Sequence, residues 1–152
     1  MSEPIRYTSL SARHSLPFLF PAQAQKEAVI NEALARLDAL AHPAVEGSAT
    51  SPPEAPGEGE CWLVADGASG PWLGRDNAIA TFGGGSWHFI APCPGMTCWS
   101  VAQRQSLRYD DAWLVAAPIA PPDGGATIDT ESRVVIAAIL NALTMAGIFP
   151  PS

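Results

Sequence analysis

Side chains that could carry enzyme chemistry are few in this chain, and their spacing does not bring them together. The three histidines, His14, His42 and His88, lie far apart. Glu58 and Glu60 form a pair of carboxylates, but they belong to a stretch rich in Pro and Gly that cannot hold an acid and a base in place. The sequence has neither a Gly-x-Ser-x-Gly motif nor a phosphate-binding glycine loop. We therefore expect no enzymatic activity, no catalytic residues, no cofactor and no metal.

The three cysteines, Cys61, Cys93 and Cys98, are too few for a disulfide framework or a four-ligand zinc site. We expect them to be small buried hydrophobic side chains of a protein made in a reducing cytosol. A bridge between Cys93 and Cys98 is the alternative.

Aromatic side chains are the more informative group, because all five tryptophans fall between residues 62 and 113. Packing in the core of a small sheet explains most of them. Exposed rings could instead stack on the apolar face of a sugar. The candidates for such a glycan-binding site are Trp72, Trp87 and Tyr109. Trp72 ranks first because its turn context makes it hard to bury.

Residues 1–20 have mixed polarity, contain two prolines and show no helical or strand periodicity. They predict an extended arm. The arm ends in the apolar cluster Phe18, Leu19 and Phe20, which we expect to dock on another surface.

The next segment, residues 22–41, has the periodicity of an amphipathic helix that is stopped by Pro43. Val29, Ala33 and Leu37 share the face that should cover a sheet. Asn31 lies near its edge and could bond a strand backbone. The predicted solvent-facing side chains are Gln23, Gln25, Lys26, Glu32, Arg36 and Asp38.

Short strands should follow over residues 60–116, after a linker at 44–59 that is rich in Pro, Gly, Glu and Ser. Gly83, Gly84 and Gly85 predict a hairpin tip. These patterns indicate an α+β fold in which the helix packs on a small antiparallel meander of about six strands. Helix and meander give a first domain that spans residues 21–117, after the separate arm at 1–20.

A stiff Pro/Gly linker, residues 118–128, leads to a second helix over 129–146 within the C-terminal segment 129–152. Asp129 is a suitable N-cap residue and Gly147 a suitable C′ residue. The helix has no charged residue after Arg133. Its predicted interface side chains are Val135, Ile136, Ile139, Leu140 and Leu143.

A helix that is apolar nearly all round must be buried. Leaving five such side chains in water would forfeit roughly 10 kcal/mol, which is comparable to the stability of a whole domain. The helix could fold back on its own strands as a monomer, or identical helices could bundle around a symmetry axis. The linker and the low charge favour a bundle, with a trimer preferred and a pentamer as the alternative.

The charge and the hydropathy of the chain limit the kinds of partner that it can bind. Charged residues make up only 15% of the chain, its net charge is −7, and Lys26 is the single lysine. Because a phosphate backbone or an anionic bilayer attracts clustered Lys and Arg, we expect neither nucleic acid nor membrane as a partner. The first thirteen residues lack the apolar core of a signal peptide, and the run from Val134 to Leu140 is too short to span a bilayer.

Several blocks, taken in order, resemble a phage family named only as domain of unknown function 2793. Ala22-Gln23-Ala24-Gln25-Lys26 and Asn31-Glu32-Ala33-Leu34 are similar to the family's Gly-Gln-Ala-Gln-Lys and Asn-Glu-Ala-Leu. Gly67-Ala68-Ser69-Gly70-Pro71-Trp72 is similar to its Ala-Thr-Gly-x-Trp turn, and Tyr109-Asp110-Asp111-Ala112-Trp113 also matches in kind. The resemblance covers roughly residues 14–115.

The resemblance implies a virion protein without known catalytic residues. The family occurs in prophages and gene transfer agents, in head-spike, head-fibre and tail-fibre proteins. We therefore expect a homo-oligomeric structural subunit that contacts other capsid, spike or fibre proteins and contributes to host attachment. A receptor module for host capsular polysaccharide is the first alternative, and a cytosolic chaperone-like or regulatory protein is the second.

Overall fold

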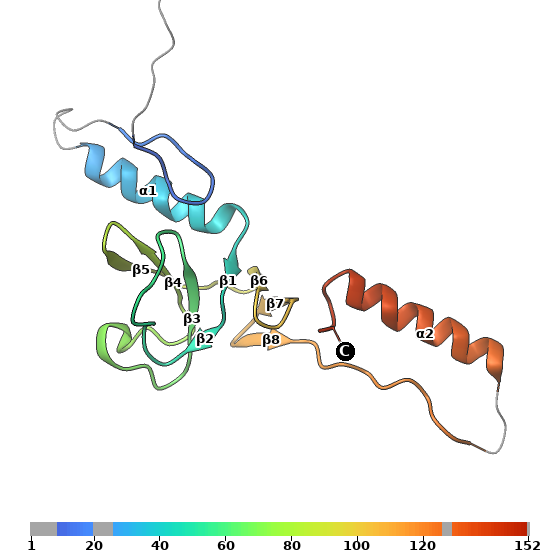
Figure 1. The fold of residues 1–152 in the computed structure, drawn as a ribbon. Helices are drawn as coiled ribbons and strands as arrows, with labels where there is room; N and C mark the ends of the chain where they lie inside the picture. Colours follow the sequence, from blue (N-terminus) through green and yellow to red (C-terminus); the bar gives the residue numbers. More distant parts are fainter. Residues whose placement is uncertain (1–8, 20–25, 126–128, 152) are drawn as a thin grey trace, which may run out of the picture. The chain divides into compact units, whose positions relative to one another are not determined.

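The computed structural model describes residues 9–19, 26–125 and 129–151. The fold is α+β, as predicted, with two helices and two small β-sheets (Figure 1). The chain divides into two compact units, the N-terminal unit of residues 1–92 and the C-terminal unit of residues 93–152. The division falls inside the stretch 21–117, which the sequence alone presents as a single domain.

The helix of the N-terminal unit, α1 (Lys26–Ala41), ends just before Pro43, as its sequence predicts. Its orientation differs from the prediction. Asp38 is buried, whereas Val29 and Leu37 are 72% and 57% exposed. Glu32 and Arg36 are exposed, as predicted, so the prediction is wrong only for Asp38 on that side. Asp38 is covered because residues 9–19, the N-terminal loop, fold onto α1 (Figure 1).

A four-stranded arrangement holds the centre of this unit: β2 (Ser48–Ala49), β3 (Cys61–Val64), β4 (Ile79–Gly83) and β5 (Ser86–Ile90). β3, β4 and β5 are antiparallel, and Gly84 and Gly85 turn the hairpin with φ angles of 60° and 76°. Two-residue hairpin turns require such positive φ values, so this predicted turn is confirmed.

The strand pairs within residues 60–116 are antiparallel, as predicted, but they belong to two sheets and not to one meander. The pairing of β2 with β3 is parallel and adds a strand from the predicted linker. The stretch 44–59 is also more than a linker. It contains β1 (Ala44–Val45) as well as β2, and Val45 is buried. Backbone hydrogen bonds from Glu46 to Cys61 and from Leu63 to Gly47 join the stretch to β3. These partners lie well along the chain, where local composition gives no signal of them.

The core of the N-terminal unit forms around Trp72, which lies in the 3₁₀ turn η1 (Gly70–Trp72). Val64, Ala68 and Ala80 surround the indole, and Trp62, Trp87 and Phe89 pack against them as half-buried side chains. Small alanines beside large aromatic rings fill the space without voids, as close-packed interiors require.

In the C-terminal unit, β6 (Thr97–Ser100), β7 (Gln105–Tyr109) and β8 (Trp113–Val115) form an antiparallel meander. An extended segment then leads to α2 (Thr130–Met145). The bounds of α2 agree with the predicted helix within one residue at each end. No helix among the described residues is long and apolar enough to span a bilayer.

Candidate functional site

The ends of α2 are defined by well-formed caps. At its start, the Asp129 carboxylate accepts hydrogen bonds from the backbone N–H of Ser132 at 2.9 Å and from its hydroxyl at 2.8 Å. These bonds hold the pKa of Asp129 below its ordinary value. At its end, Gly147 has φ 71° and donates to Thr144, while Ile148 donates to Leu143. This pair of bonds is the Schellman motif, which glycine at this position permits.

Both ends of α2 are also tied to the C-terminal unit. Arg133 donates from its guanidinium to the carbonyl oxygens of Pro122 and Gly124. At the other end, Ser106 of β7 donates to the carbonyl of Gly147 at 2.6 Å, and the Trp99 ring lies directly against Gly147. The helix is therefore held against the strands at its C-terminal end, and its start is bonded to the exposed segment that precedes it.

Between those ends, α2 is uncovered. None of its residues is buried. Of the apolar stripe (Val135, Ile136, Ile139, Leu140 and Leu143), the first three are 57%, 39% and 53% exposed and the last two are half-buried. The strands of the C-terminal unit thus leave the predicted interface side chains accessible, which is the geometry that a bundle of copies requires.

Two of the predicted glycan-binding residues, Trp72 and Trp87, pack against each other in the N-terminal unit. Trp72 is 0% exposed, so the expectation that its turn keeps it accessible is wrong. The 3₁₀ turn directs the ring inward, and its edge meets the Trp87 ring at a centroid distance of 5.1 Å and an interplanar angle of 89°. Trp87 is half-buried and also contacts Phe82.

The third glycan candidate, Tyr109, belongs to the C-terminal unit. Its half-buried ring lies 5.3 Å from the half-buried ring of Trp113, across the β7–β8 turn. Asp110 and Asp111 at this turn are exposed. The structure thus pairs Tyr109 with a second aromatic ring, that of Trp113, which was not among the predicted glycan-binding residues.

The N-terminal loop is not an extended arm in its described part. Leu10 and Pro17 form an antiparallel bridge, Ser11 donates to the Leu16 carbonyl, and Phe18 donates to the Ser9 carbonyl. Phe18 and Leu19 are half-buried. The third predicted docking residue, Phe20, lies outside the described residues.

Asp38 is the residue that holds this loop on α1. Its carboxylate accepts hydrogen bonds from the Ser11 hydroxyl (2.6 Å) and from the backbone N–H groups of Arg13 (2.8 Å) and His14 (2.6 Å). Burial raises its pKa, but these hydrogen bonds outweigh burial and place the pKa below the ordinary 3.8. Sequence reasoning missed this role, because an Asp on a helix ordinarily indicates a solvated face.

Asn31 secures the other end of the loop. Its amide oxygen accepts from the backbone N–H of Leu19 at 2.9 Å, and its amide nitrogen donates to the Leu19 carbonyl at 3.3 Å. The predicted bond between Asn31 and a backbone therefore exists, but the partner is the loop and not a strand.

The cysteines are not joined by any disulfide. Cys61 and Cys98 are buried, as expected, whereas Cys93 is exposed, so the expectation of three buried thiols is wrong for that residue. Burial raises the pKa of Cys61. Within the described ranges, no group of three His, Cys, Asp or Glu side chains could hold a metal ion.

Two comparisons with known proteins complete the description. A search of the curated proteins finds no match. The family model described as protein of unknown function (DUF2793) matches residues 30–114, more than half of the chain. The match begins within α1 and ends at β8, and α2 lies outside it. This confirms the resemblance on which the sequence analysis drew, and the chain therefore belongs to the DUF2793 family.

Proposed function

We propose that this chain is a structural subunit of a phage-like particle, a head-spike or fibre component that self-associates through α2 and contributes to attachment to the host surface. The observation that carries this proposal is the uncovered apolar stripe of α2, a helix that has no charge after Arg133.

The free energy of burying apolar side chains favours an assembly in which the apolar stripe of α2 is covered. Each aliphatic side chain that becomes fully buried contributes about 1.5–3 kcal/mol. Val135, Ile136 and Ile139 are each at least one-third exposed in a single copy, so packing them would add several kcal/mol per copy. A second copy presents an identical stripe, and no like charges on that stripe oppose the approach. A trimer is the preferred assembly, because Ile and Leu mixed along a helical seam suit it.

The particle context rests on family membership and on the family's occurrence in prophages and gene transfer agents. Other capsid, spike or fibre proteins are the proposed partners, and the bacterial cytoplasm is the proposed place of synthesis before assembly. The exposed stripe of α1 at Val29 and Leu37 offers a further apolar surface for such contacts.

Particle membership is tested by purifying particles from a lysate of the bacterium that encodes the chain, through a density gradient, followed by mass spectrometry. We expect the chain to co-sediment with the capsid proteins at a constant ratio across the peak. Recovery only in the soluble protein fraction would contradict the proposal and would favour the cytosolic alternative.

A carbohydrate-binding receptor module is the second candidate function. It is favoured by the half-buried Tyr109–Trp113 pair beside the exposed Asp110 and Asp111. A glycan array that includes bacterial capsular polysaccharides tests it. The hypothesis predicts a signal that disappears in Tyr109→Ala and persists in Leu73→Ala, a change at an exposed residue of the N-terminal unit. An array without signal for the wild-type chain would eliminate it.

A further inference from the structure

A cavity of about 700 Å³ lies within the N-terminal unit, and no step of the proposed function uses it. Its walls come from the N-terminal loop, from α1 and from the β4–β5 hairpin with the residues that precede β3. Its volume falls in the range of about 300–1,000 Å³ that is typical of small-ligand sites. The lining side chains that decide its chemistry are Leu10, Phe18, Phe82, Glu32, Asp38 and Glu58.

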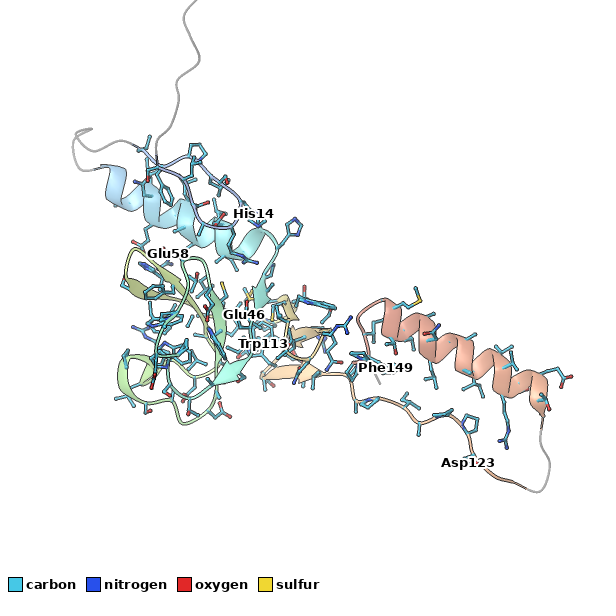
Figure 2. All side chains as sticks on the ribbon, in the orientation of Figure 1. His14, Glu46, Glu58, Trp113, Asp123 and Phe149 are labelled. Carbon is cyan, nitrogen blue, oxygen red and sulfur yellow. The ribbon has the colours of Figure 1, made fainter. Side chains whose placement is uncertain are left out.

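Hydrogen bonds fix the walls of this cavity before any ligand enters. Asp38 ties the loop to α1 through three donors, and Asn31 adds two bonds to the backbone of Leu19. On the opposite wall, the Glu58 carboxylate accepts from the backbone N–H of Gly84 at 3.1 Å. Figure 2 shows Glu58 at the side of the hairpin that faces α1. A site that is already formed binds without the entropic cost of ordering its walls.

Carboxylates dominate the titratable groups of the lining. It includes Glu32, Asp38 and Glu58, with His88 as its basic side chain and neither Lys nor Arg. Arg36 pairs with Glu32 at 2.8 Å and offsets that charge. Asp38 is ionised at neutral pH, because hydrogen bonds lower its pKa. Among the described residues, Glu58 makes no ion pair, and its second oxygen is available to a ligand because the bond from Gly84 uses only Oε2.

Apolar side chains line another part of the cavity. Phe18 and Phe82 come from opposite walls, and Leu10 joins them. Aromatic faces attract cations, and they also cover aliphatic carbon. A lining that combines carboxylates with aromatic rings suits a positive group on an apolar stem. It repels phosphate and carboxylate ligands.

We propose that this cavity binds an alkylammonium group, the chemistry that a lysine side chain of a peptide and a free aliphatic amine share. Glu58 makes the direct ionic contact, Asp38 supplies negative potential from the loop side, and the phenylalanines cover the stem. The proposal is independent of self-association through α2.

Isothermal titration calorimetry of the full chain tests the site with n-hexylammonium, n-hexanol and n-hexanoate. We expect the ammonium to bind up to about fivefold more tightly than the alcohol, since Glu58 is exposed and a charge contact with an exposed carboxylate is worth up to about this factor. Hexanoate should bind more weakly still. Equal affinities for the three probes would overturn the proposal.

Two substitutions that change the net charge equally test whether the ammonium group contacts Glu58. Glu58→Gln should lower the affinity for n-hexylammonium by up to about fivefold, and its amide oxygen can still accept from Gly84, so the hairpin stays intact. Glu54→Gln alters an exposed residue outside the cavity and should leave the affinity unchanged. Identical affinities for the two variants, with unchanged circular dichroism, would contradict the site.

Peptide probes separate the two sources of the ammonium. Acetyl-Gly-Leu-Lys-Leu-Gly-amide is compared with the same peptide that has norleucine in place of lysine. Tighter binding of the lysine peptide than of n-hexylammonium supports a peptide ligand, and preference for the free amine supports a small-molecule ligand. Failure of both cationic probes to bind overturns the proposal. Ile139→Asp, which alters the apolar stripe of α2, should leave these affinities unchanged.

Discussion

The carboxylate of Asp38 connects two segments that lie far apart in the sequence, the N-terminal loop and α1. Three donors point at a group with little access to water, and charge-assisted bonds of this kind are stronger than bonds between neutral groups. The same contact shapes one wall of the cavity. A change at this residue should therefore affect both stability and the loop.

Asp38→Asn should lower the free energy of unfolding by about 1–3 kcal/mol at pH 7, because the amide offers one acceptor where the carboxylate offered two. The folded-state pKa lies below the ordinary 3.8, so the stabilisation is present above about pH 4. It should be lost as the pH falls through the lowered folded-state value. Chemical denaturation of both proteins as a function of pH measures this difference.

Asp111→Asn is the control for that series, because it removes the same charge from an exposed turn. Its unfolding free energy should follow the wild type across the whole pH range. A constant difference between wild type and Asp38→Asn from pH 7 to pH 2 would contradict the assigned role of the Asp38 carboxylate.

Trp72 and its neighbour Leu73 give a second comparison between adjacent residues. Trp72→Ala should cost about 3–5 kcal/mol, since it empties the centre of the N-terminal core. Leu73 is exposed, and Leu73→Ala should change stability by less than about 0.5 kcal/mol. Urea denaturation followed by circular dichroism measures both, and equal effects would contradict the buried position of Trp72.

Among the elements, α2 was the most predictable from sequence and the edge of the first sheet the least. Asp129 and Gly147 are local signals, and each acts within one turn of the helix that it ends. The strand β2 depends on its parallel pairing with β3, across a Pro/Gly-rich stretch whose composition indicates a loop. Long-range pairing of this kind leaves no periodic pattern in so short a strand.

The inward face of α1 shows a related difficulty. Its apolar positions predicted the buried side, yet Val29 and Leu37 are exposed and Asp38 is covered. The N-terminal loop offers backbone donors, and a carboxylate satisfies them better than an aliphatic side chain can. The prediction that Trp72 is exposed was wrong because a residue in a turn can still direct its side chain into the core.

Gly147 is the element-scale test, since it ends α2 and meets Trp99. Gly147→Ala should lower the free energy of unfolding by more than about 2 kcal/mol, because it combines left-handed backbone strain with a clash against the indole. Gly67→Ala has similar strain, with φ 76°, but open space around the added methyl group. It should cost about 1–2 kcal/mol. Urea denaturation should rank the two variants in this order, and the reverse order would contradict the contact.

At the scale of the whole molecule, the exposed large hydrophobic side chains are concentrated in the C-terminal unit. They include Val134, Val135, Ile136, Ile139 and Met145 of α2 and Leu114 and Val115 of β8. The family match covers parts of both units but ends before α2. The helix α2 therefore lies outside the part of the chain that matches the family. This position agrees with the proposal that α2 is an assembly element separate from the family's domain.

Sedimentation velocity of the wild type, Ile139→Asp and Asn141→Asp tests the central claim most directly. Both variants add one negative charge to α2, but only Ile139 belongs to the apolar stripe, and Asn141 lies on the polar side of the helix. Self-association through the stripe predicts a multiple of 15.9 kDa, preferably three copies, for the wild type and Asn141→Asp. Ile139→Asp should sediment as a folded single chain. A wild-type protein that sediments at 15.9 kDa up to high concentration would contradict the account.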